Sequence, residues 1–174
     1  RDLGESGKPA IFAYSETLVM LGVVTINGAA ILILDNRRAL YPALATILAG
    51  FAVVALAIGG YTQGWLTAVA FLVLTGIGMY VPYVAFHTTL FERMIAVFRD
   101  KSNIGYLMYL ADAMGYLSYV AVMLFRNFSQ SSIRYLSFFL RTSLLICLVS
   151  ILLMIVCCVL IGLAYADLGL IDNT

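Results

Sequence analysis

Long apolar stretches, separated by short polar or glycine-containing junctions, run along almost the whole chain. The junctions lie at 35–38, 59–64, 99–102 and 126–134. Each stretch has about 20 residues or more, which is the length that a helix needs to cross a hydrocarbon layer about 30 Å thick. The pattern therefore predicts an all-α fold, a polytopic bundle of five transmembrane helices.

The boundaries of these elements follow from the same pattern. The predicted spans cover about 16–34, 39–60, 65–98, 103–125 and 137–165, so that the bundle occupies 16–166 between a polar loop at 1–15 and a tail at 167–174. The third run is too long for one untilted span, and Pro82 lies near its middle. Because a proline bends a membrane helix and frees a backbone carbonyl, we expect this span to be kinked at Pro82.

Composition narrows the function classes. Of 174 residues, 63% are hydrophobic and 11% are charged, whereas soluble domains average roughly 45–50% apolar and about 25% charged residues. This predicts an integral, multi-pass membrane protein whose surroundings are the lipid bilayer. The net charge of +1 argues against a nucleic-acid partner, because such domains are usually strongly basic on one face.

Signatures of enzymes and metal centres are missing from the sequence. It contains no H-E-x-x-H, no G-x-S-x-G and no phosphate-binding glycine loop, so we do not expect an enzyme. The three cysteines share one apolar run without metal-ligand spacing, and there is a single histidine. We therefore expect no metal site and no cofactor.

One face of the fourth span combines an acid with tyrosines. Its members are Tyr106, Tyr109, Asp112, Tyr116 and Tyr119. Their spacings gather them within about 140° of the helix circumference. Small residues that let membrane helices approach closely lie nearly opposite, at Ala111, Gly115 and Ser118. The first face is typical of a hydrated or ligand-lined cavity, and the second is typical of close packing.

A second polar face is predicted on the third span. Its members are Gly76, Tyr80, Tyr83, His87 and Phe91. His87 and Asp112 each lie about ten residues from the charged junction, or roughly 15 Å along their helices, so they can meet. Two interpretations stay open: the two side chains relay a proton, or Asp112 pairs with a basic residue while His87 bonds a carbonyl freed by Pro82.

The remaining polar candidates are interhelical or gate residues. They are Asn27, Glu92, Arg93, Asp35, Arg37 and Arg38. Glu92 and Arg93 are adjacent and so point apart, and each is expected to bond a neighbouring helix or a lipid headgroup. We expect Asn27 to join two helices.

Two parts of the sequence resemble a known superfamily. The turn Asp-Asn-Arg-Arg-Ala at 35–39 resembles the second copy of the acidic-basic cytoplasmic loop of the major facilitator superfamily, with Asn36 where that pattern has a glycine. A longer likeness, to an uncharacterised bacterial branch, covers most of the chain. It includes Lys-Pro-Ala-Ile-Phe at 8–12, Phe-Glu-Arg-Met-Ile-Ala at 91–96 and Tyr-Leu-Ala-Asp-Ala-Met-Gly-Tyr at 109–116.

The resemblance implies an architecture and a location. The five spans would match helices eight to twelve of such a transporter, while helix seven and the N-terminal half lie outside this chain. Spans 39–60 and 137–165 would be outer, lipid-facing supports, and the other three would line the cavity. The junctions at 35–38 and 99–102 would be cytoplasmic, and the membrane would be the bacterial inner membrane.

Together these observations predict the C-terminal fragment of a secondary active or facilitative transporter that works by alternating access on a small-molecule substrate. The missing N-terminal half would be its partner. The cavity candidates are Asp112, His87, Tyr80, Tyr83, Tyr109 and Tyr116. The alternative is a non-transporting membrane subunit that docks a partner through Asp112 and the small-residue face.

Overall fold

The computed structural model describes residues 9–30, 32–33, 36–98, 103–128 and 135–171. Every regular element in these ranges is helical, which confirms the all-α prediction. The elements are α1 (Pro9–Ala30), α2 (Asn36–Thr62), α3 (Ala68–Ala85), the π-helical turn η1 (Phe86–Leu90), α4 (Phe91–Phe98), α5 (Ile104–Phe128) and α6 (Tyr135–Ile171).

Five helical stretches are long and apolar enough to cross a membrane, as the sequence predicts. They are Ile11–Ala30, Ala39–Thr62, Ala68–Val97, Ile104–Phe125 and Leu136–Ala164. The third comprises α3, η1 and most of α4, which follow one another as a single crossing. The protein is therefore an integral, multi-pass membrane protein.

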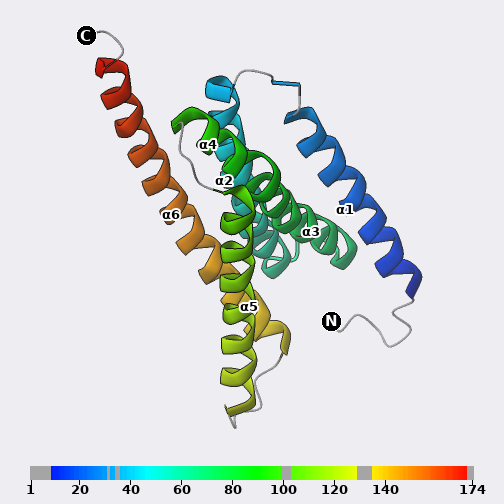
Figure 1. Ribbon diagram of the computed structural model, residues 1–174. Helices are drawn as coiled ribbons and strands as arrows, with labels where there is room; N and C mark the ends of the chain where they lie inside the picture. Colours follow the sequence, from blue (N-terminus) through cyan, green and yellow to red (C-terminus); the bar gives the residue numbers. More distant parts are fainter. Residues whose placement is uncertain (1–8, 31, 34–35, 99–102, 129–134, 172–174) are drawn as a thin grey trace.

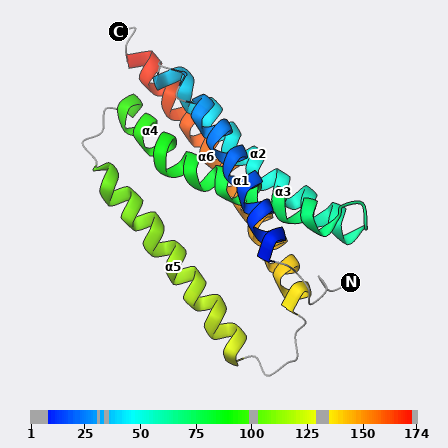
Figure 2. The ribbon, with the colours of Figure 1, turned by 90° about the vertical axis from the view of Figure 1, so that its right-hand side faces the viewer.

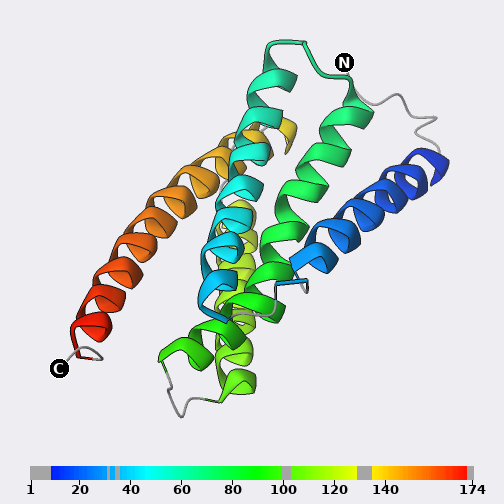
Figure 3. The ribbon, with the colours of Figure 1, turned by 90° about the horizontal axis from the view of Figure 1, so that it is seen from above.

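Successive crossings run in alternating directions, so that α1 begins and α6 ends at opposite ends of the bundle (Figure 1). Seen from above, α2 and α3 lie side by side, with α1 beside α3 and α6 beside α2 (Figure 3). Helix α5 stands apart from the other helices along much of its length (Figure 2). None of the most apolar window of α5 is buried inside the protein.

Helix α2 is the centre of the packed part. It contacts α1, α3, α4 and α6, and its Leu40, Ile47 and Val54 side chains are fully buried. The resemblance implied an outer, lipid-facing place for span 39–60, which stays a prediction: 44% of the apolar window of α2 is buried, while Tyr41 and Leu56 remain 50% and 74% exposed. Small side chains such as Ala43 and Ala57, both buried, let neighbouring helices close around α2.

Glycines bring α2 and α3 into near-backbone contact. A Cβ atom added at Gly50 would lie 2.3 Å from Pro82 Cγ, and one at Gly78 would lie 2.8 Å from the Gly50 carbonyl oxygen. Both distances are shorter than real Cβ contacts, so no larger residue fits there without a shift. Pro82 thus has a packing role, because its buried ring fills the space above Gly50.

The ends of two helices differ from the sequence prediction. Helix α1 begins at Pro9, so a polar loop over 1–15 is wrong for its last seven residues. A proline suits the first turn of a helix, where its missing N–H costs nothing. Ser15 and Thr17 do not interrupt α1, because their hydroxyls donate to the carbonyls of Phe12 at 2.9 Å and Ala13 at 2.8 Å. Helix α6 continues to Ile171, beyond the predicted end at 165.

The third crossing also departs from its prediction. It starts at Ala68 rather than at 65, because Thr67 caps it by accepting a hydrogen bond from the Ala70 N–H at 3.3 Å. The tight turn before it uses Gly64 at φ +79°, which glycine adopts without steric cost. Pro82 lies inside α3, which continues past it, and the π-helical turn η1, an irregularity that the sequence did not predict, begins four residues later. The kink at Pro82 itself stays a prediction.

Candidate functional site

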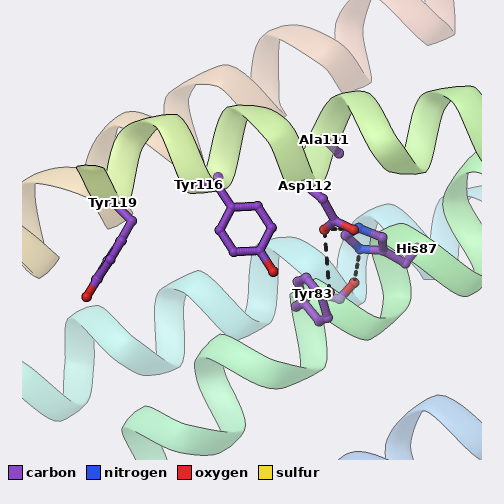
Figure 4. Close-up of a pocket in the computed structure, with 7 residues that line it drawn as sticks. Tyr83, His87, Ala111, Asp112, Tyr116 and Tyr119 are labelled. Atoms are coloured by element: carbon purple, nitrogen blue, oxygen red, sulfur yellow. Dashed lines mark hydrogen bonds and ion pairs between the residues drawn. The ribbon is translucent and has the colours of Figure 1, made fainter. Parts of the chain in front are cut away.

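The side chains of His87 on η1 and Asp112 on α5 are in direct contact. Nε2 of His87 lies 3.1 Å from Oδ1 of Asp112 (Figure 4). The Tyr83 hydroxyl of α3 donates to the same Oδ1 over a long 3.5 Å. Residues of α3 and η1 thus both contact one carboxylate oxygen of α5. The side chain of His87 is 16% exposed and that of Asp112 is 38% exposed.

The second ring nitrogen of His87 is also bonded. Nδ1 lies 2.9 Å from the Tyr83 carbonyl oxygen of its own helix, and the Tyr83 and His87 rings lie 4.3 Å apart. Pro82 has no N–H, so the carbonyl that it frees is that of residue 78, four residues earlier. His87 bonds the Tyr83 carbonyl instead, so the predicted bond to the freed carbonyl is not formed. The partner of Asp112 is this histidine, which is itself a basic residue, so the contact fits both the proton relay and the pairing that joins two helices.

These contacts determine how many protons the pair holds. A carbonyl oxygen only accepts, so the bond to Tyr83 requires a hydrogen on Nδ1 of His87. Nε2 then faces a carboxyl oxygen, and without a proton between them two lone pairs would repel. With the ring hydrogens assigned in this way, the contact is made through one proton, either as imidazolium beside carboxylate or as neutral imidazole beside carboxylic acid.

An open pocket of about 550 Å³ lies beside this pair, between α3 with η1 and α5. Its lining residues are Tyr83, His87, Ala111, Asp112, Gly115, Tyr116 and Tyr119. Tyr116 projects from α5 into the space between the helices (Figure 4). Because Ala111 and Gly115 line the same pocket as Asp112, the predicted division of this helix into a cavity face and a packing face is wrong at these two positions.

The structure brings together four of the six predicted cavity residues, namely His87, Asp112, Tyr83 and Tyr116. Tyr80 and Tyr109 do not line the pocket, and they are 59% and 79% exposed. Sequence reasoning left three lining residues out of its site: Ala111, Gly115 and Tyr119. The positions 111, 112, 115, 116 and 119 repeat at three and four residues, which is the signal that finds them.

A second polar pocket, of about 540 Å³, lies between α1 and the segment made of η1 and α4. It contains three of the predicted interhelical residues, Asn27, Glu92 and Arg93. The Arg93 Nη2 donates to the Ile33 carbonyl at 3.3 Å, beyond the end of α1. Asn27 instead donates to the Val23 carbonyl of its own helix at 3.1 Å.

The structure does not describe the side chains of the three other predicted gate residues. Asp35 lies outside the described residues, while Arg37 and Arg38 belong to the first turn of α2 with side chains outside the described part. Over the residues that the structure describes, no three His, Cys, Asp or Glu side chains gather closely enough to hold a metal ion.

Comparison with known proteins gives a family without an activity. No curated protein and no solved structure matches the chain. One protein family, described as a family of unknown function (DUF5690), matches residues 1–162. That match covers most of the 174 residues and carries no link to the major facilitator superfamily. The chain, with its five membrane-spanning stretches and its His87–Asp112 pair, belongs to this family of unknown function, DUF5690.

Proposed function

We propose that this protein is part of a secondary active or facilitative transporter of the major facilitator type, which works by alternating access in a bacterial inner membrane. The observation that carries the proposal is the contact between His87 and Asp112 on the wall of an open pocket. The two residues belong to different crossings, so their shared proton lies where one helix meets another.

Energetics support a transport role for this pair. Ionisable groups within a membrane segment are costly and commonly mark ion or substrate pathways. Asp112 remains 38% exposed on its side chain, so its surroundings must supply either water or a ligand. A proton at a helix contact also provides a means of coupling, because adding or removing it changes how strongly the two helices bind each other.

The tyrosines of α5 support a hydrated pathway that further protein completes. Tyr106, Tyr109, Tyr116 and Tyr119 are 65%, 79%, 73% and 63% exposed. A phenol hydroxyl that faces lipid tails loses its hydrogen bonds, at a cost of roughly 1–3 kcal/mol. We infer that this face meets water and additional helices, which is the role expected for the N-terminal half of such a transporter.

The proposal is tested with the full-length protein in liposomes that carry a proton gradient. The vesicles are exposed to a mixture of small metabolites, and accumulated compounds are identified by mass spectrometry. We expect at least one compound to accumulate with the wild-type protein and not with Asp112→Asn. Glu16→Gln is the matched control, because it makes the same chemical change at an exposed acid on α1. Uptake that is equal in wild type and Asp112→Asn would contradict the assigned role.

One observation favours the alternative, a membrane subunit without transport activity. On the small-residue side of α5, Ser118 is exposed and lies outside the pocket. Ser118→Leu therefore separates the two functions. A docking subunit should lose its co-purifying partner in this variant, whereas a transporter should keep its uptake.

A further inference from the structure

The pocket beside Asp112 has a chemistry that selects its ligand. Among the side chains that the structure describes, its charged or chargeable residues, apart from the tyrosines, are Asp112 and His87, and no lysine or arginine lines it. Three phenol rings, those of Tyr83, Tyr116 and Tyr119, form much of the remaining wall. Aromatic faces and a carboxylate both attract positive charge, and a volume of about 550 Å³ lies in the range of small-molecule sites.

We propose that this pocket binds a small organic cation, and that the cation exchanges with the single proton held between His87 and Asp112. This inference rests on the proposed transport function and specifies its substrate class. In the proton-bound state the pair carries no net charge in either of its two arrangements. When the cation binds, the proton leaves to the solvent, His87 becomes neutral and the Asp112 carboxylate neutralises the ligand.

The exchange balances charge and breaks one hydrogen bond, because Nε2 of neutral His87 no longer holds a proton that it shares with Asp112. One positive charge enters and one leaves, so the pocket keeps its net charge in the membrane interior, where an uncompensated charge is costly. Neutral His87 still donates from Nδ1 to the Tyr83 carbonyl. Asp112 keeps the Tyr83 hydroxyl as a donor, and it gains the cation in place of the proton on its other neighbour.

Other ionisable groups near the pair do not offer the same exchange. The titratable residues that face it are Tyr83 from α3 and Tyr116 and Tyr119 from α5. Glu92 and Arg93 follow His87 on the same crossing but line the separate pocket beside α1. Proton release upon cation binding is thus assigned to the His87–Asp112 pair.

The test uses the full-length protein in detergent and the probe benzyltrimethylammonium. Its charge is permanent, so any proton released comes from the protein. Isothermal titration calorimetry in buffers of different ionisation enthalpy yields both the dissociation constant and the number of protons released. We expect about one proton to be released per bound cation. In the pH range in which the free protein holds the proton, the affinity for the cation should rise roughly tenfold per pH unit. Benzenesulfonate, an anion that also has one aromatic ring, should bind at least about tenfold more weakly because it meets Asp112.

Variants identify the groups responsible. Asp112→Asn should lose cation binding and proton release together, while Glu16→Gln should retain both. Tyr116→Phe keeps the aromatic face and should retain binding, whereas Tyr116→Leu should weaken it by about three- to tenfold. Tyr106→Leu is the control on the same helix, because Tyr106 is 65% exposed and does not line the pocket.

The outcomes separate this inference from the proposed function. Equal affinity for benzenesulfonate, or cation binding without proton release, would overturn the exchange. If the cation does not bind while the metabolite screen still shows uptake that depends on Asp112, the transporter stands and the substrate class is wrong. Cation binding with proton release, but without flux of any compound into liposomes, would support the exchange site and overturn the transport function.

Discussion

The two nitrogens of His87 point at two oxygens, and this makes Asp112 the polar residue whose replacement is most informative. Its amide analogue keeps the shape of the side chain and can donate a hydrogen bond to Nε2, but it cannot release a proton. A change that preserves the contact and removes the titration separates chemical from structural roles.

We predict that Asp112→Asn abolishes proton-coupled transport, with a loss of at least about tenfold, and leaves the fold intact. Its thermal midpoint should stay within about 2–4 °C of wild type, which corresponds to roughly 1 kcal/mol for a chain of this size. Transport in liposomes and thermal unfolding in detergent measure the two effects. A large drop in midpoint together with an unaltered pH profile would show that Asp112 only joins the two helices.

We also predict that His87→Gln changes the pH dependence of transport. Glutamine can bond Asp112 but cannot share a titrating proton with it, so the acid would titrate alone. The pH midpoint should move on the order of one unit, the size expected when a close charged neighbour is removed. A rate-against-pH curve for wild type and variant checks this. An unchanged midpoint would mean that Asp112 binds its proton without His87.

At the scale of whole helices, the close crossing of α2 and α3 is the feature most open to direct test. We predict that Gly50→Ala and Gly78→Ala each destabilise the protein by about 1–3 kcal/mol, because the added methyl group overpacks a rigid contact. Chemical or thermal unfolding in detergent measures the change in the free energy of unfolding.

Gly59→Ala is the matched control for these two variants, since it lies on α2 and a Cβ atom there meets nothing within 4 Å. Alanine favours a helix over glycine by about 1 kcal/mol, so this variant should be neutral or more stable. Equal destabilisation by all three substitutions would show that the crossing is looser than the distances indicate.

The same elements show what a sequence reveals and what it hides. Apolar length predicts the five crossings because the bilayer demands it, and counting from one junction places His87 and Asp112 at equal depth. Helical periodicity groups residues by face but does not say which neighbour the face meets. Periodicity therefore assigns Gly115 to packing although it lines the pocket, and it assigns Tyr109 to the cavity although this exposed residue is not among the pocket-lining residues.

Local sequence rules also missed the π-helical turn. Pro82 is a visible helix breaker, yet α3 continues past it because Gly50 on α2 accommodates its ring. Nothing in the composition of Phe86–Leu90 distinguishes a π turn from an ordinary helix. Such turns depend on how a crossing packs against its neighbours, and they recur at functional sites. Here the turn carries the histidine of the site.

At the scale of the molecule, the alternating crossings predict which side of the membrane each junction faces. Leu32, which is 82% exposed, follows α1, and Gln63 follows α2, so the two residues lie at opposite ends of one crossing. We predict that cysteines introduced at Leu32 and Gln63 react with a membrane-impermeant maleimide from opposite sides, with residue 32 cytoplasmic.

The native cysteines at 147, 157 and 158 are replaced beforehand, so that the label reports only the new thiols. Labelling of intact cells and of inverted vesicles distinguishes the two sides. Reaction of both cysteines from the same side would show that α2 does not cross, and the five-span topology would then be wrong.

Helix α5 has no buried residue in its apolar window, and it is joined to α3 and η1 by polar bonds that converge on Asp112. Thermodynamic reciprocity then applies to its position. If binding of the proton raises the equilibrium constant for docking of α5 by some factor, docking raises the affinity for the proton by the same factor. Each tenfold change corresponds to about 1.4 kcal/mol. Under the proposed exchange, the position of α5 therefore depends on the proton concentration on the side to which the pocket opens.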